Sequence, residues 1–194
     1  MKTVNSRLNF LYRKQTFLNG ALRRLLCNAL IQPHFDYACT AWYPNLNKRL
    51  TKGIQISQNK CIRFCLGLDI RAHIGVKEFV NMKWLPTKQR FEQCVCASVF
   101  KIFKETTPAY ISEIYHPVNQ SRDTRRSKDK LHKPLRSKNL GQKVFFFIGP
   151  KLWNNLHSNV KSVINVNVNT FKHEIKGKFL EDLKKKEDDI YVYY

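Results

Sequence analysis

The stretch KRLTKGIQISQNKCIRFCL, Lys48–Leu66, has the periodicity of one amphipathic helix around which the other segments can be arranged. Projected at 100° per residue, its apolar and polar side chains separate onto two sides. The apolar set is Leu50, Ile54, Cys61, Phe64 and Cys65, and the polar set is Lys48, Lys52, Asn59 and Arg63. One side can pack into a core while the other meets phosphates or is merely solvated. Gly53 costs about 1 kcal/mol relative to alanine inside a helix, and it indicates either close packing or a break.

Amphipathic helices are also predicted before this segment. Residues 4–14 carry Leu8, Leu11 and Tyr12 at helical spacing. Residues 21–31 place five apolar side chains on one face, which predicts a packed helix: Leu22, Leu25, Leu26, Ala29 and Leu30. Asn19 and Gly20 provide its start and Pro33 its stop. Arg23 and Arg24 are then expected to point away from the core.

The run IQPHFDYACTAW, residues 31–42, joins these helices and contains an isolated acid, Asp36, among apolar residues. A buried carboxylate without partners would be expensive. Asp36 is therefore expected to cap a turn or to pair with an arginine, and His34 is expected to be structural.

Two helices are predicted in the second half of the chain. Pro86 suits the first turn of a helix that is apolar around most of its circumference and should therefore be central. Its apolar residues are Phe91, Cys94, Val95, Val99 and Ile102 on one arc, and Cys96, Phe100 and Phe103 nearly opposite. A later helix over residues 170–183 should close the core with one stripe: Phe171, Ile175, Phe179 and Leu183.

Between them lies a strongly basic stretch, residues 118–143, which lacks the apolar content to fold alone and is expected to be exposed. The apolar run at residues 144–148 then predicts a buried strand, paired in a hairpin with residues 131–135 across a turn at residues 139–141. Gly149 and Pro150 end that strand and open a short helix with Leu152, Trp153 and Leu156.

Composition points to a polyanionic partner. The 194 residues are 43% hydrophobic, enough to bury a sizeable core, and the net charge is +21. Before Asp69 the sole acidic residue is Asp36, while Lys and Arg recur throughout. Charge of this size attracts nucleic acid over a long range and releases counterions on binding. A basic surface that is only solvated is the alternative.

The six cysteines do not predict disulfides. Five of them, Cys27, Cys61, Cys65, Cys94 and Cys96, fall inside helical patterns, where cysteine behaves as a small buried hydrophobe. The first residues lack the apolar core of a secretory signal, so a reducing, intracellular compartment is expected. The longest apolar run, residues 144–148, is far too short to cross a bilayer.

Four short motifs occur in a family's order. They are IQPHFDYACTAW at residues 31–42, QNKCIR at 58–63, WLP at 84–86 and GPKLWNNL at 149–156. This set resembles the region downstream of the catalytic palm in reverse transcriptases of non-LTR retrotransposons, the jockey-like and related elements. The resemblance extends over about residues 4–183, and Thr124-Arg125 matches a further dipeptide of the family. His157 stands where the family usually has the proline of a Leu-Pro pair.

The resemblance implies a thumb, whose helices lie against a template–primer duplex, but no polymerase chemistry. The family's polymerases hold two metal ions with an Asp-Asp turn and an earlier Asp. The adjacent acidic pairs here lie in the lysine-rich end, at residues 181–182 and 187–189, where a solvated helix end is the simpler interpretation. The chain is therefore expected to be a non-catalytic fragment without cofactors.

Cys61, Cys65 and His73 also match the first three positions of a Cys-x3-Cys-x7-His-x4-Cys arrangement found in some of these elements. Glu78 stands at the fourth position. Structural zinc requires a closed set of four ligands, so these cysteines are predicted to pack in the core and no metal is expected.

Taken together, these observations predict a mainly α fold: a helical thumb-like bundle, a basic segment, a short β-hairpin and C-terminal helices. The expected domains are a helical domain at residues 1–116, a basic linker at 117–143, a small α/β subdomain at 144–183 and a tail at 184–194. The predicted nucleic-acid contacts are Lys48, Lys52, Arg63, Arg23, Arg24, Arg122, Arg125, Arg126, Lys133 and Arg136.

Two functions remain open. In the first, the chain binds RNA, cDNA or an RNA–DNA hybrid in a nuclear or cytoplasmic ribonucleoprotein, with or without the rest of a retroelement polymerase. In the second, it is a repurposed helical module whose basic surface recognises an acidic protein.

Overall fold

The computed structural model describes residues 2–104, 106–113, 130–134, 138–156 and 166–185. Helices dominate this part of the chain and it contains no strand, so the predicted mainly α class is confirmed. None of the helices formed by the described residues is long and apolar enough to span a membrane.

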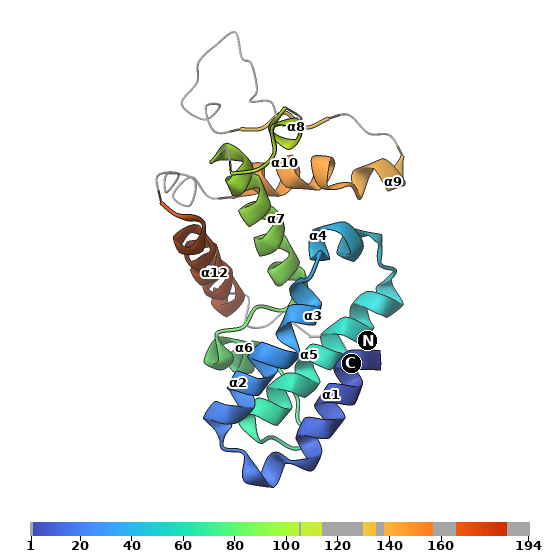
Figure 1. Cartoon of the computed structure of the whole chain (residues 1–194), viewed down its shortest axis with the longest axis vertical. Helices are drawn as coiled ribbons and strands as arrows, with labels where there is room; N and C mark the ends of the chain where they lie inside the picture. Colours follow the sequence, from blue (N-terminus) through green and yellow to red (C-terminus); the bar gives the residue numbers. More distant parts are fainter. Residues whose placement is uncertain (1, 105, 114–129, 135–137, 157–165, 186–194) are drawn as a thin grey trace. The chain divides into compact units, whose positions relative to one another are not determined.

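The chain divides into two compact units that interleave along the sequence (Figure 1). Unit 1 comprises Met1–Cys39, Leu46–Arg90 and Lys178–Tyr194, and unit 2 comprises Thr40–Asn45 and Phe91–Gly177. Two long helices, α7 (Thr87–Phe103) and α12 (Val168–Lys185), contribute residues to both.

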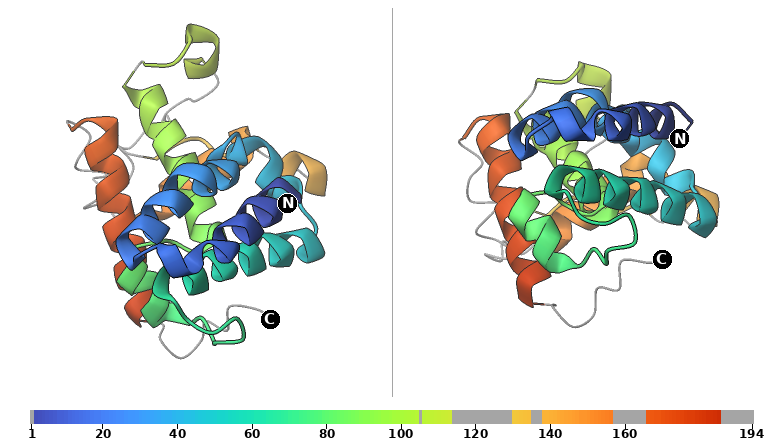
Figure 2. Two further views of the ribbon diagram at one scale, coloured as in Figure 1. Left: turned by 60° about the horizontal axis from the view of Figure 1, so that its bottom comes forward. Right: turned by 90° about the horizontal axis from the view of Figure 1, so that it is seen from below.

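Unit 1 is built around α5, which spans the predicted residues Lys48–Leu66. The Asn47 side chain caps its start by accepting from the Leu50 N–H at 2.9 Å, and Gly67 ends it at φ 67°. That positive φ favours glycine. The helices that precede α5 are α1 (Lys2–Arg13), a 3-10 turn η1 (Gln15–Phe17), α2 (Gly20–Leu30) and α3 (Gln32–Asp36). Both α1 and α2 pack on α5 (Figure 2).

The remaining elements of unit 1 pack beside α5. The helix α6 (Val76–Met82) follows it, and the start of α7 and the end of α12 complete the unit. Val76, Leu85 and Leu183 form a buried cluster, against which Phe179 of α12 is partly buried. The predicted stripe on residues 170–183 is confirmed, since Phe171 and Ile175 are also buried.

Unit 2 has an aromatic core on α7, α10 (Phe145–Asn155) and α12. The rings of Phe100 and Phe171 stack with centroids 4.0 Å apart, and Trp153 lies 4.9 Å from Phe103 and 5.9 Å from Phe171. Burial of Val95, Cys96, Val99 and Phe100 confirms the prediction that α7 is a central helix. The unit also includes α8 (Ala109–Ser112), α9 (Asn139–Gln142), most of the short helix α4 (Cys39–Trp42) and the 3-10 turn η2 (Tyr43–Asn45).

The predicted β-hairpin is wrong. Residues 145–148 form the first turn of α10, and the expected turn at residues 139–141 lies in α9. Phe147, Pro150 and Trp153 are buried at a spacing of three residues, while Phe146 is 37% exposed. A short apolar run has no period that separates a buried strand from a buried helix. The described part of residues 144–183 is accordingly helical rather than α/β.

The face predicted for α2 is also wrong. The helix packs through Cys27 and through Ile31 just beyond it, which are fully buried. Leu22, Leu25 and Leu30 of the predicted core face are exposed by 44%, 61% and 38%. The apolar stripe exists, but it lies on the outside of unit 1.

Candidate nucleic-acid interface

The exposed cations of α5 are confined to its first turns. Lys48, Arg49 and Lys52 are exposed, and the first N–H groups of a helix lack intrahelical acceptors and carry the positive end of its dipole. Ser57 Oγ donates to Asn5 Oδ1 at 3.4 Å, so the start of α1 lies beside the middle of α5 (Figure 2). The sequence prediction found Lys48 and Lys52 but missed Arg49, which follows Lys48 directly.

The prediction that Arg63 lies on an exposed face of α5 is wrong. Arg63 is 8% exposed, and its Nε donates to the Ala72 carbonyl at 2.7 Å. Asn59, predicted on the same face, is also buried and accepts a hydrogen bond from Gln55 Nε2 at 3.0 Å. The second half of α5 is surrounded on all sides, so its polar residues bind other parts of unit 1.

Arg23 and Arg24 do not point freely away from the core either. Arg23 donates to the carbonyls of Leu18 at 2.9 Å and Gln15 at 3.0 Å, and its guanidinium lies 5.8 Å from the Phe64 ring centroid. Arg24 donates to the Met82 carbonyl at 2.7 Å. Both side chains are half-buried and tie segments of unit 1 together, although both keep their charge.

The carboxylates near these cations are engaged. Asp36 forms a bidentate pair with Arg90, 54 residues away in the sequence, which confirms the predicted pairing with an arginine. Asp69 accepts the Arg71 N–H at 2.8 Å, and Glu78 accepts the Gly75 N–H at 2.7 Å. His34 receives a contact of 2.8 Å from Arg7 Nη1, in line with its predicted structural role. Asp36 is the sole acidic residue before Asp69, so cations greatly outnumber carboxylates over this part of the sequence.

Unit 2 carries a second group of cations around α10. Lys133 is exposed and its Nζ lies 4.8 Å from the ring centroid of Phe147. Lys143, two residues before α10 begins, and Lys151, within α10, are also exposed. The sequence prediction missed Lys151 because it confined the basic surface to residues 118–143, before the predicted strand. The predicted contacts Arg122, Arg125, Arg126 and Arg136 lie outside the described residues.

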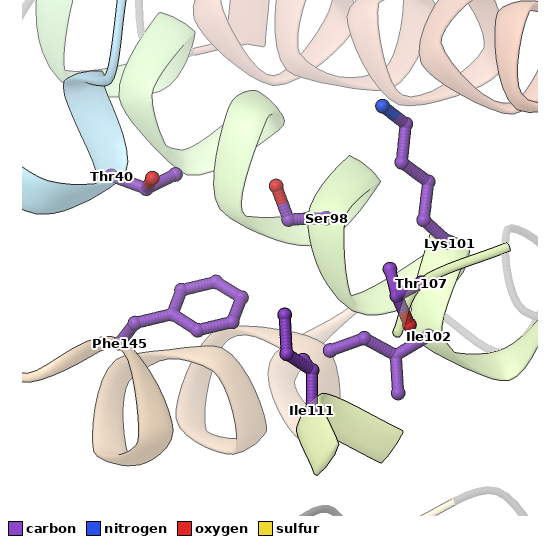
Figure 3. A pocket seen from close by; sticks show the side chains of 7 residues that line it. All are labelled: Thr40, Ser98, Lys101, Ile102, Thr107, Ile111 and Phe145. Atoms are coloured by element: carbon purple, nitrogen blue, oxygen red, sulfur yellow. The ribbon is translucent and has the colours of Figure 1, made fainter. Parts of the chain in front are cut away.

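A pocket of about 220 Å³ is present in unit 2 (Figure 3). Phe145, Ile111 and Ile102 line one side, and Thr40 and Ser98 lie across from them, with the Lys101 ammonium extended away from the Phe145 ring. Ser98 Oγ already donates to the Cys94 carbonyl at 2.9 Å. Lys101 is the one titratable side chain of this described lining, so the pocket offers no acid–base pair.

The cysteines pack as predicted for small apolar side chains. Cys27 and Cys61 are fully buried and Cys65 is 4% exposed, whereas His73 is exposed and Glu78 caps α6. No disulfide joins any of the six cysteines, all of which lie in described segments. Nor do three His, Cys, Asp or Glu side chains of those segments gather where a metal ion could be held.

Neighbouring thiols and burial raise the pKa of two of these cysteines, Cys27 and Cys65, and so keep them protonated. A hydrogen bond with Cys61 raises the pKa of Cys27, and one with Cys27 raises that of Cys65, with burial adding to both. The thiolate is the reactive form of cysteine, so these side chains are poor nucleophiles and poor metal ligands.

Comparison with known proteins identifies no relative. No family model matches the chain, and no match was found among curated proteins or among solved structures.

Proposed function

We propose that this chain is a non-catalytic, nucleic-acid-binding part of a retroelement RNA-directed DNA polymerase, and that it holds RNA or an RNA–DNA hybrid through phosphate contacts. The observation that carries the proposal is the group of exposed cations at the start of α5, Lys48, Arg49 and Lys52. The sole carboxylate side chain before Asp69 is Asp36, which is paired with Arg90.

The arrangement suits a backbone rather than a base sequence. Cations at a helix start combine side-chain charge with backbone N–H groups, which is a favourable setting for phosphate. Lys133, Lys143 and Lys151 give unit 2 a comparable group of exposed ammonium groups. Lysine binds phosphate as a point charge, so little base preference is expected.

The four family motifs support the polymerase origin, and the missing Asp-Asp turn supports the absence of catalysis. The described pocket adds no acid–base pair that would supply another chemistry. In this proposal the chain contributes grip on the template and primer, and the metal-binding carboxylates belong to a different part of the polymerase.

Salt dependence of binding tests the α5 contacts. Lys48→Gln/Arg49→Gln/Lys52→Gln should reduce the slope of log K against log[salt] by roughly 2 on single-stranded RNA, because each lost phosphate contact removes about 0.7. The measurement is fluorescence anisotropy with labelled RNA and with an RNA–DNA hybrid at several salt concentrations.

A matched control removes the same charge from elsewhere in unit 1. Lys77, Lys88 and Lys184 are exposed on α6, α7 and α12, and changing all three to Gln should alter the slope far less. Equal losses from both triple variants would mean that binding follows net charge alone. An unchanged slope in the α5 variant would contradict a contact at that helix.

A further inference from the structure

We propose that the outer face of α2 docks an amphipathic helix of a partner protein whose polar side is acidic. The proposal concerns a surface other than the start of α5 and is independent of nucleic-acid binding. It rests on how α2 is oriented in unit 1 and on the charges around it.

The orientation of α2 is the reverse of that of an ordinary surface helix. Its inner side is formed by Cys27 and by Arg23 and Arg24, whose guanidinium groups donate to carbonyls of neighbouring segments. Its apolar stripe faces outward, with Leu22 44% and Leu25 61% exposed. A contiguous apolar stripe on a surface is typical of an interaction site, because leaving it in water is unfavourable.

Two phenylalanines on the elements that precede α2 are exposed as well. Phe17, in the 3-10 turn just before α2, is 81% exposed, and Phe10 on α1 is 59% exposed. The C-terminal end of α2 adds Leu30, whose carbonyl accepts from Arg7 of α1 at 2.8 Å. Aromatic side chains are enriched in protein interfaces, and apolar side chains at helical spacing are the contacts by which amphipathic helices dock.

The charges beside the stripe determine the partner's chemistry. Arg7 lies at the C-terminal end of the stripe, where it donates to the Leu30 carbonyl. Exposed Arg13 and Lys14 lie at the other end. They come directly before Gln15, whose carbonyl accepts a hydrogen bond from Arg23 at the start of α2. No acidic residue other than the paired Asp36 occurs before Asp69. A partner with carboxylates around an apolar face would complement this surface. A second copy of a chain with net charge +21 would instead be repelled.

The shape of the stripe favours a helix over a lipid surface. Leu22, Leu25, Leu26 and Ala29 recur at i, i+3, i+4 and i+7, which forms one ridge along a single helix. Such a ridge fits between the side-chain rows of another helix. The arginines on α2 that could reach lipid headgroups are already bound to carbonyls on its inner side.

The probe is a synthetic peptide of about 18 residues with leucines at helical spacing and glutamates elsewhere, a length of about five helical turns. Its fluorescence anisotropy is measured against the full chain. Two control peptides are used. One has lysines in place of the glutamates, and the other has the same composition with leucines at every second position. Each should bind at least about tenfold more weakly, the factor that follows from losing one interface anchor.

A pair of variants locates the site. Leu22→Gln/Leu25→Gln should weaken binding of the acidic peptide at least about tenfold, and Phe10→Gln should weaken it in the same direction. The control Tyr110→Gln/Val144→Gln, on side chains 67% and 46% exposed in unit 2, should leave the affinity unchanged. Both pairs should lower the unfolding temperature alike and only slightly, because each of the four side chains keeps more than two fifths of its surface in solvent.

Five results would overturn the proposal. The first is equal loss of affinity in the stripe variant and its control, and the second is a lowered unfolding temperature in the stripe variant alone. The third is stripe-dependent binding to phosphatidylserine vesicles without binding to the acidic peptide, and the fourth is a stripe-dependent dimer in sedimentation. Peptide binding that requires deletion of residues 187–194 would likewise identify the chain's own acidic, tyrosine-rich end as the occupant and would overturn it.

Discussion

Polar side chains in the second half of α5 organise unit 1 from within. Gln55 Oε1 accepts from the N–H of Thr87 at 3.0 Å and from its hydroxyl at 2.8 Å, and Gln58 donates to the Leu85 carbonyl at 2.8 Å. Arg63 holds the Ala72 carbonyl in the same way. These bonds fix the segments that lead to α6 and α7. The Thr87 N–H and the Leu85 carbonyl are buried backbone groups that would destabilise the fold if they had no partner.

Tyr12 makes the corresponding contact between α1 and α5, and it predicts a pH effect. Its hydroxyl donates to the Lys60 carbonyl at 3.0 Å, and burial, with a smaller contribution from Cys61, raises its pKa to about 12. The folded state therefore keeps a proton that the unfolded chain loses near pH 10. This contribution to stability is full below pH 10 and is lost as the pH rises toward 12.

Tyr12→Phe tests this contact. The variant should lose about 1 kcal/mol of stability at neutral pH, the usual contribution of one hydrogen bond. The difference from wild type should shrink between pH 10 and about 12, because only the wild type carries the Tyr12 proton. Urea unfolding at several pH values measures both effects, and Tyr110→Phe, on a side chain 67% exposed, is the control. A difference that stays constant with pH would contradict the assignment.

At the scale of elements, the helices were predictable where local chemistry and packing agree. The predicted range 48–66 matches α5, which is capped by Asn47 and Gly67, and the stripe of α12 follows one period throughout. The strand predicted at the start of α10 was wrong because its apolar run has no period. The buried face predicted for α2 was wrong because the apolar stripe shows which side is apolar but not which side other segments cover. Arg63 was misplaced because a projection assumes one buried side, whereas nearly every residue in the second half of α5 is buried. Long-range packing decides all three.

Gly53 gives a prediction within α5. The helix continues through it, and a Cβ added there would meet nothing within 4 Å, so neither a break nor close packing requires glycine. Gly53→Ala should raise stability by about 0.5–1 kcal/mol, because alanine loses less backbone entropy in a helix. Thermal unfolding should show an increase of roughly 2–4 °C per kcal/mol for a chain of this size.

The contrasting substitution is Gly67→Ala at the end of the same helix. There φ is 67° and a Cβ would lie 2.9 Å from Arg23 Nη1, so stability should fall. If Gly53→Ala also lowered the unfolding temperature, the side chains near it would have to lie closer than the structure places them.

At the scale of the whole molecule, net charge opposes folding and favours binding at once. The chain carries 35 Lys and Arg against 14 Asp and Glu. Arg90–Asp36 and Lys178–Glu181 are ion pairs among the described residues, and both are partly exposed. Repulsion among like charges is stronger in the compact state than in the unfolded chain. A bound polyanion would relieve that repulsion in the folded state, so ligand binding and stability should be linked.

Salt should therefore stabilise this protein. Raising NaCl from about 20 mM to about 500 mM shortens the screening length several-fold and should raise the unfolding temperature by several degrees, since screening weakens more repulsive than attractive pairs. At low salt, single-stranded RNA should raise the unfolding temperature further, and this increment should disappear at high salt as phosphate contacts weaken. KCl serves as the control for ion-specific effects and should give the same curve.

An unfolding temperature that falls with salt would mean that attractive pairs outweigh the repulsion. An RNA increment that persists at high salt would mean that binding does not rest on phosphate contacts.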